Sequence, residues 1–150
     1  MEYELLIREA EIEDAAELVS FLNRVSVETD FTSLDRDGIL MTDTEMESFL
    51  DKQAHSENQI TLLSLLNDEI AGLVNITADQ RKRVRHIGDL FIVIGKKYWN
   101  NGLGSLLIEE AIEWAQASGI LRRLQLTVQT RNQAAVHLYQ KHGFVIEGRQ

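Results

Sequence analysis

The sequence predicts one mixed α/β (α+β) domain in which helices flank a central, largely antiparallel sheet. Three observations predict this fold. Apolar residues recur at helical spacing in some segments and alternate or run together in others. Two strand-like segments are separated only by Asn67 and Asp68, a pair that suits the tight turn of an antiparallel hairpin. A helical segment later stands between two further strands, which predicts a parallel, right-handed crossover.

In the first half of the chain we expect a strand, two helices and the hairpin. Apolar residues from Ile12 to Leu22 have helical spacing, and Thr42 or Thr44, each followed by acidic residues, can cap a second helix. The expected elements are a strand at 3–9, a helix at about 12–22, a helix from position 42 or 44 to about 52, and strands at 60–66 and 70–77.

In the second half we expect three strands and two helices. The apolar run 90–94 predicts a strand buried on both faces, and hence a central one. Gly119 and Gly143 each follow a helical segment and can end it. The expected elements are strands at 84–94, about 124–128 and 144–147, and helices at 102–118 and from Asn132 to about 142. No proline, linker, repeat or low-complexity tract interrupts the sequence, so a single domain is expected over 1–150.

The composition excludes several kinds of chemistry. The chain contains no cysteine, which excludes a disulfide-stapled scaffold, a thiolate zinc site and a cysteine nucleophile. His55, His137 and His142 have no partners at metal-ligand spacing, so no metal site is expected. The sequence shows neither a signal peptide nor a run of about 20 apolar residues, so we expect a cytoplasmic protein without a membrane partner.

The charge is distributed unevenly along the chain. Residues 1–80 hold four basic and 19 acidic side chains, a balance of −15, whereas residues 81–150 hold 11 basic and five acidic ones, a balance of +6. An acidic half is a poor partner for nucleic acid, and a basic half with short glycine motifs suits a compact polyphosphate. The alternative is that the charge serves solubility alone.

A short glycine motif lies between the predicted central strand and the helix that follows it. The segment reads Tyr98-Trp99-Asn100-Asn101-Gly102-Leu103-Gly104. Glycine lets the backbone approach a ligand, and the amides at a helix N-terminus attract phosphate oxygens, so this turn is expected to hold a pyrophosphate. A side chain at Gly102 or Gly104 is expected to obstruct the phosphates, and Gly104→Val is expected to weaken binding of the ligand while leaving the fold intact. An ordinary turn is the alternative, because no Gly-Lys-Ser/Thr follows and Leu107 stands where a dinucleotide fingerprint has its third glycine.

Two motifs together resemble the GNAT superfamily of acetyl-CoA-dependent N-acetyltransferases. The turn from Trp99 to Gly104 is similar to the family's Gln/Arg-x-x-Gly-x-Gly/Ala signature, except that Trp99 replaces the first residue. The segment from Asn132 to Phe144 is similar to the family's Asn-x-x-Ala-x-x-x-Tyr-x-x-x-Gly-Phe pattern. The resemblance covers residues 84–148 well, whereas only the order of elements supports it over residues 1–80.

The resemblance implies a sheet that is splayed between its two parallel central strands, with acetyl-CoA bound in the opening. The residues that it implies for cofactor binding are Ile92, Val93 and Ile94 for the pantetheine, Asn100, Asn101, Gly102, Leu103, Gly104 and Ser105 for the pyrophosphate, and Asn132 for a further pantetheine contact. Family members usually add one more C-terminal strand, so either this sequence ends early or a partner supplies that strand, which leaves a homodimer open.

The resemblance also implies two catalytic residues. Tyr139 corresponds to the general acid, because a phenol with a pKa of about 10 stays protonated until a thiolate leaves. The alternative for Tyr139 is a core aromatic. Asp89, on the predicted central strand, is the expected base. Its alternatives are the end of a strand or an arginine pair, and a bulge in this strand would reverse the face on which Asp89 lies.

We therefore expect direct acetyl transfer from acetyl-CoA to a primary amine. The alternatives are a non-catalytic protein that binds or senses CoA on the same fold, and a nucleotide-phosphate binding module of another fold. The acidic first half, with Glu28, Asp30 and Asp35 between its helices, predicts a polycationic acceptor, because carboxylates raise the local concentration of cations.

Overall fold

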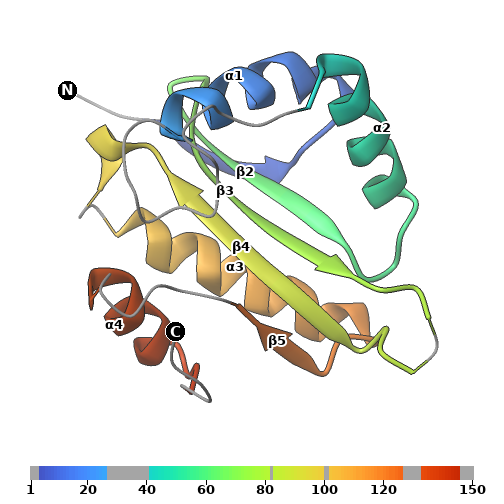
Figure 1. Cartoon of the computed structure of the whole chain (residues 1–150). Coiled ribbons are helices and arrows are strands. Elements are labelled where there is room, and N and C mark those ends of the chain that lie inside the picture. The colour runs from blue at the N-terminus through green and yellow to red at the C-terminus, as the bar shows by residue number, and fades with distance from the viewer. Residues whose placement is uncertain (1–3, 27–40, 82, 100–101, 127–132, 146–150) are drawn as a thin grey trace.

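A five-stranded sheet in the order β1-β2-β3-β4-β5 forms the centre of the structure (Figure 1). The structure is a computed structural model, and it describes residues 4–26, 41–81, 83–99, 102–126 and 133–145. The strands are β1 (Leu5–Glu9), β2 (Ile60–Leu66), β3 (Glu69–Ala78), β4 (Ile87–Ile94) and β5 (Arg123–Gln125). Neighbours from β1 to β4 are antiparallel, and β4 and β5 are parallel. The predicted mixed, largely antiparallel sheet is confirmed.

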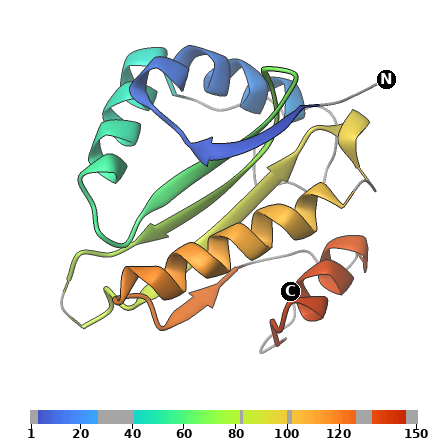
Figure 2. The same ribbon diagram turned by 180° about the vertical axis from the view of Figure 1, so that it is seen from behind.

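Helices cover both faces of this sheet (Figures 1 and 2). The helices are α1 (Ala15–Ser26), α2 (Asp43–Ala54), α3 (Leu103–Ser118) and α4 (Gln133–Lys141), with short 3₁₀ turns η1 (Ile12–Asp14) and η2 (Lys96–Tyr98). Helices α1 and α2 lie on one face, and α3 lies on the other. Helix α4 lies beside the first turn of α3, where Leu138 approaches Gly104. Among the described residues, no helix is both long and apolar enough to cross a membrane.

Local sequence signals account for several boundaries. Asn67 and Asp68 have positive φ angles of 51° and 70°, as a two-residue hairpin between β2 and β3 requires. The hydroxyl of Thr42 accepts a hydrogen bond from the Glu45 amide, and the Glu45 carboxylate accepts one from the Thr42 amide. This reciprocal capping box starts α2 at the predicted place.

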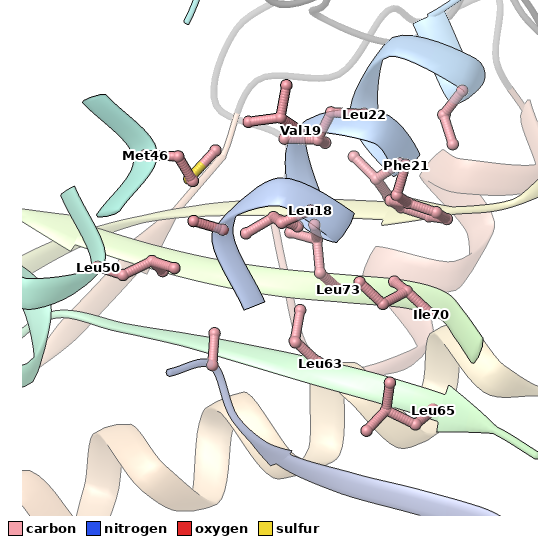
Figure 3. Packing of buried hydrophobic residues seen from close by; sticks show 14 residues of the cluster. Leu18, Val19, Phe21, Leu22, Met46, Leu50, Leu63, Leu65, Ile70 and Leu73 are labelled. Atoms are coloured by element: carbon pink, nitrogen blue, oxygen red, sulfur yellow. The ribbon is translucent and has the colours of Figure 1, made fainter. Parts of the chain in front are cut away.

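Two hydrophobic clusters hold the layers together, one on each side of the sheet. Figure 3 shows the first cluster, in which side chains of α1 and α2 meet those of β2, β3 and β4. Leu63 and Phe21 are almost completely buried there. The second cluster joins α3 to the opposite face, around Ile76 and Leu107. Full burial of each such side chain contributes about 1.5–3 kcal/mol, so the two clusters fix the helices on the sheet.

Several predicted boundaries differ from the structure: α1, for example, continues to Ser26 rather than ending near Leu22, and β5 ends at Gln125. Residues 84–86 form a turn rather than the start of β4, because the Val84 carbonyl accepts from the Ile87 amide. Residues 12–14 form a 3₁₀ turn ahead of α1, since the Asp14 carboxylate accepts from the Glu11 amide and pairs with Arg8. Phe144 and Val145 are not in a strand, and the Phe144 amide instead donates to the Tyr139 carbonyl. The remainder of that predicted strand lies outside the described residues.

Candidate functional site

The two parallel strands pair over only three residues each, and the described pairing ends at Asp89 and Gln125. From Leu90 to Ile94, β4 is paired with β3 along one edge, and along its other edge no pair with β5 is described. The Gly95 amide donates to the Ala71 carbonyl (2.9 Å), so the neighbouring Gly72–Ile94 pair is one that does not exchange hydrogen bonds. The N–H and C=O groups of Ile94, and by alternation those of Ile92, therefore point toward the β5 side.

In the same register, the backbone groups of Val93 point in the opposite direction to those of Ile92 and Ile94. Its backbone groups point toward β3, opposite Leu73, and its side chain is buried against α1. Of the three residues expected to offer backbone groups to a pantetheine chain, we therefore keep Ile92 and Ile94 as candidates. Both side chains are half-buried on the α3 face of the sheet.

Trp99 lies at the end of this edge. Its indole Nε1 donates to the carbonyl oxygen of Ile94 (2.9 Å), and the side chain stays 41% exposed. The hydrogen bond closes the turn formed by η2 and satisfies one of the outward-facing groups of β4. Trp99, the first residue of the glycine motif's signature, therefore fixes the end of β4. This contact could not be inferred from the sequence.

The N-terminus of α3 presents backbone amides, as the glycine motif predicts. The Leu106 amide is bonded to the Gly102 carbonyl (3.2 Å), and the three preceding amides, of Leu103, Gly104 and Ser105, come before the first bond within the helix. Such amides and the helix dipole favour a phosphate group. Asn100 and Asn101, which were expected to complete this cradle, and Asn132 lie outside the described residues.

The two glycines of the motif have different structural roles. Gly102 has φ of 79°, a left-handed conformation, and a Cβ atom there would meet nothing within 4 Å. A Cβ atom on Gly104 would stand 3.0 Å from Leu138 and 3.2 Å from Ile94. Gly104 therefore permits close packing of α3 against α4 and β4, and a side chain there requires Leu138 and Ile94 to shift.

Tyr139 lies on α4, edge-on to Phe144 with ring centroids 5.9 Å apart. Burial raises the pKa of Tyr139 to about 12, because the ionised phenolate loses its hydration. The side chain therefore stays protonated across the whole physiological range, as a general acid for a leaving thiolate must. Its place in an aromatic pair also agrees with a core role, so the geometry alone leaves both interpretations open.

Asp89 is exposed on the face of the sheet that carries α1 and α2, together with Phe91. The register between β3 and β4 runs from Gly72–Ile94 to Ala78–Gly88 without a shift, so no bulge reverses this face. Gln125 Nε2 donates to Asp89 Oδ1 (2.8 Å), so the partner is a neutral amide rather than an arginine. A carboxylate thus stands where the described pairing of the parallel strands ends.

A second polar contact joins α4 to the start of α3. His142 Nε2 lies 3.2 Å from Ser105 Oγ, beside the amides of the glycine motif. No role for His142 follows from the sequence patterns, and only its place before Gly143 could have suggested one. Among the described residues, no group of three His, Cys, Asp or Glu side chains is arranged to hold a metal ion.

Comparison with known proteins agrees with this arrangement. The Acetyltransferase (GNAT) family matches residues 12–144. The crystal structure of a GNAT acetyltransferase from Streptococcus pneumoniae is 87% identical, covers 97% of this chain and 86% of that one, and superposes with a TM-score of 0.95. An acetyltransferase from Salmonella typhimurium, solved with its cofactor acetyl-CoA, shares the fold at 18% identity, with a TM-score of 0.83 over 97% of this chain and 82% of that one.

Curated relatives match over shorter stretches. The L-amino acid N-acetyltransferase AaaT of Escherichia coli is 33% identical over 87 residues, 58% of this chain and 54% of the relative. Spermidine N(1)-acetyltransferase of E. coli is 28% identical over 104 residues, 69% of this chain and 55% of the relative. The aligned stretch thus spans about half the length of these curated relatives. Because the family match covers most of the sequence, the chain belongs to the GNAT family of acetyltransferases.

Proposed function

We propose that this protein transfers an acetyl group directly from acetyl-CoA to a primary amine. The observation that carries the proposal is the edge of β4 at Ile92 and Ile94, whose backbone groups point away from β3 beyond the last described β4–β5 pair. The amides of Leu103, Gly104 and Ser105 lie at the next helix N-terminus along the chain. An edge that can bind an amide-containing arm, followed by a cradle for phosphates, fits the pantetheine and pyrophosphate of acetyl-CoA.

The chain supplies a proton acceptor and a proton donor for this transfer. Asp89 takes a proton from the ammonium group, so that the neutral amine can attack the thioester carbonyl carbon. As the new C–N bond forms and the C–S bond breaks, Tyr139 gives its proton to the departing sulfur. Its raised pKa, about 12, keeps that proton available at neutral pH. The nitrogen of the new amide then carries one surplus proton, which it returns to the Tyr139 phenolate, and Asp89 releases its proton to solvent. The net products are the N-acetylated amine, the CoA thiol and one proton.

Two features bear on the acceptor. The acidic first half of the chain supports a polycationic acceptor, and the spermidine-acetylating relative agrees with it. The relative named for L-amino acids supports an acceptor with a single ammonium group. The residues Glu28, Asp30 and Asp35, on which the first expectation rests in part, lie outside the described residues.

A thiol-release assay tests the proposal with little background. Because the chain has no cysteine, a chromogenic disulfide reagent reports only the CoA that is set free. The panel should contain polyamines, aminoglycosides, basic peptides, and neutral and acidic amino acids, each at low and high salt. We expect turnover with at least one primary amine, and a rate that falls with salt for a polycation.

Binding without turnover is the result expected of the non-catalytic alternative. Acetyl-CoA would then bind in calorimetry while no amine in the panel released CoA. Competition by ATP for the same site would favour a general nucleotide-binding module. Either result would overturn the proposed transferase activity.

A further inference from the structure

The end of α4 makes a polar contact with the first turn of α3, and Figure 2 shows the two helices side by side there. His142 Nε2 lies 3.2 Å from Ser105 Oγ, and both residues are half-buried. Four positions before His142, Leu138 faces Gly104, the residue next to Ser105. Residues four positions apart lie on the same side of a helix, so one side of α4 and its final turn meets the start of α3 twice.

The backbone at the end of α4 fixes the place of the His142 ring. The Tyr139 carbonyl accepts hydrogen bonds from the amides of both His142 and Phe144 (3.1 Å each). Gly143, between these two residues, has φ of 96°, and a glycine in this left-handed region is a common end of a helix. The turn that ends α4 therefore holds His142 against α3 while the Tyr139 ring packs on Phe144.

Two arrangements of protons fit the contact between His142 and Ser105. A neutral imidazole carries its proton on either Nε2 or Nδ1. With the proton on Nε2, His142 donates to Ser105 Oγ, and the Ser105 hydroxyl can donate to a further acceptor. Without it, the Ser105 hydroxyl donates to His142. In the part of the chain that the structure describes, Nδ1 has no hydrogen-bond partner, so no second contact selects the tautomer.

The position of Ser105 in α3 favours the first arrangement when a phosphate is bound. The amide of Ser105 is one of the three that precede the first hydrogen bond within α3. The Cα–Cβ bond of a helical residue is tilted toward the helix N-terminus, so the hydroxyl lies on the side where the amides attract a phosphate. A hydrogen bond to an anionic oxygen is about twice as strong as one between neutral groups. The hydroxyl therefore gains more by donating to a phosphate than by donating to His142.

We propose that His142 is a positioning residue for the pyrophosphate of acetyl-CoA. Its Nε2–H group donates to Ser105 Oγ, which directs the hydroxyl proton of Ser105 to a phosphate oxygen. The proposal rests on the proposed function for the identity of the ligand. His142 occupies a variable position in the family pattern that runs from Asn132 to Phe144, so that pattern assigns it no role.

Nitrogen-15 NMR of the histidine side chains tests the direction of this hydrogen bond in the parent protein. The chain has four histidines, and the signals of His142 are those missing from the spectrum of His142→Gln. With CoA bound, Nε2 of His142 should carry a proton. An unprotonated Nε2 in the complex would show that Ser105 donates to His142, and would overturn the proposal whether or not other variants fold.

Variants measure the contribution to binding, by calorimetry with CoA at one fixed pH. His142→Phe keeps a planar ring but removes the donor, so the Kd should rise by about three- to tenfold. His142→Gln keeps an N–H donor and should restore most of the affinity. In a Ser105→Ala background, His142→Phe should have no further effect, because the two residues act through one hydrogen bond. His137→Phe, the same change at an exposed position of α4, is the matched control and should leave the Kd unchanged.

Shortened ligands identify the group that the pair serves. Dephospho-CoA lacks only the ribose phosphate, and S-acetylpantetheine lacks every phosphate. His142→Phe should weaken the binding of dephospho-CoA as much as that of CoA, and should leave the binding of S-acetylpantetheine unchanged. An equal loss with S-acetylpantetheine would assign His142 to packing, and a loss confined to CoA would assign it to the ribose phosphate. Either result would overturn the proposal.

The outcomes also distinguish this proposal from the proposed function. A protonated Nε2 and a loss of affinity that requires the pyrophosphate, with no amine acetylated, would support the role of His142 and overturn the transferase activity. Acetylation of an amine together with an unchanged Kd in His142→Phe would overturn the role of His142 alone. A parent protein that does not bind CoA would overturn both.

Discussion

Gln125 donates a hydrogen bond to Asp89 across the last described pair of the parallel strands, with 2.8 Å between Nε2 and Oδ1. The two residues are 36 positions apart in the chain and come from β5 and β4. The amide orients the carboxylate without neutralising it, because a neutral donor leaves the negative charge in place. Asp89, the proton acceptor that we propose, therefore has a fixed side-chain orientation at the last described pair of the parallel strands.

Replacing Asp89 should therefore reduce turnover. Asp89→Asn keeps an oxygen for Gln125 but removes the proton acceptor, so kcat/KM for the amine should fall by about 10²- to 10⁴-fold. Calorimetry should show unchanged acetyl-CoA affinity. Gln125→Leu, which only releases the carboxylate, should have the smaller effect. A rate for Asp89→Asn equal to that of the parent protein would show that another group accepts the proton.

Tyr139→Phe should separate catalysis from packing. The phenyl ring keeps the edge-on contact with Phe144, so acetyl-CoA affinity should hold while kcat falls by about 10²- to 10⁴-fold. Full activity in the folded variant would assign Tyr139 to the core and leave protonation of the thiolate to water.

Tyr139 should also affect stability at alkaline pH. Burial raises its pKa to about 12 in the folded state, against about 10 in the unfolded chain, so only the unfolded state loses the proton between these values. The contribution is fully present below pH 10 and is lost as pH rises toward 12. Urea unfolding should show that the parent loses about 2–3 kcal/mol more than Tyr139→Phe over this range. Parallel curves for the two proteins would contradict the raised pKa.

Gly104 and Leu138 should be energetically coupled. Gly104→Val introduces atoms where a Cβ already stands 3.0 Å from Leu138, so it should reduce the free energy of unfolding by about 1–3 kcal/mol. Leu138→Ala should relieve part of this loss in the double variant. Gly102→Ala is the matched control: its cost of about 1–2 kcal/mol comes from the left-handed backbone, so Leu138→Ala should not relieve it. Strict additivity of Gly104→Val and Leu138→Ala in denaturation experiments would refute the packing role.

Trp99 should contribute to acetyl-CoA binding by holding the end of β4. Trp99→Phe keeps an aromatic ring but removes the donor to Ile94, so the Kd for acetyl-CoA should rise by about two- to tenfold. Trp114→Phe, in the second hydrophobic cluster, should leave the Kd unchanged. The Trp114→Phe variant retains Trp99 as its single tryptophan, so its fluorescence should respond to acetyl-CoA. An unaltered Kd in Trp99→Phe would remove this role.

The sequence by itself determined the features that depend on neighbouring residues. The hairpin at Asn67 and Asp68 and the cap at Thr42 appear where they were predicted, because turns and caps are formed by interactions within a few residues. The order of helices and strands from β1 to α4 follows from local periodicity, and the two spaced motifs sufficed to indicate the family.

Only the tertiary structure decided how distant residues meet. The register of β4 against β3 turned the backbone groups of Ile92 and Ile94, but not those of Val93, away from β3, since backbone groups alternate in direction along a strand. Packing between α3 and α4 gave Gly104 its role and brought His142 to Ser105. None of these pairings is encoded in local spacing, because each depends on which surfaces come together when the layers pack.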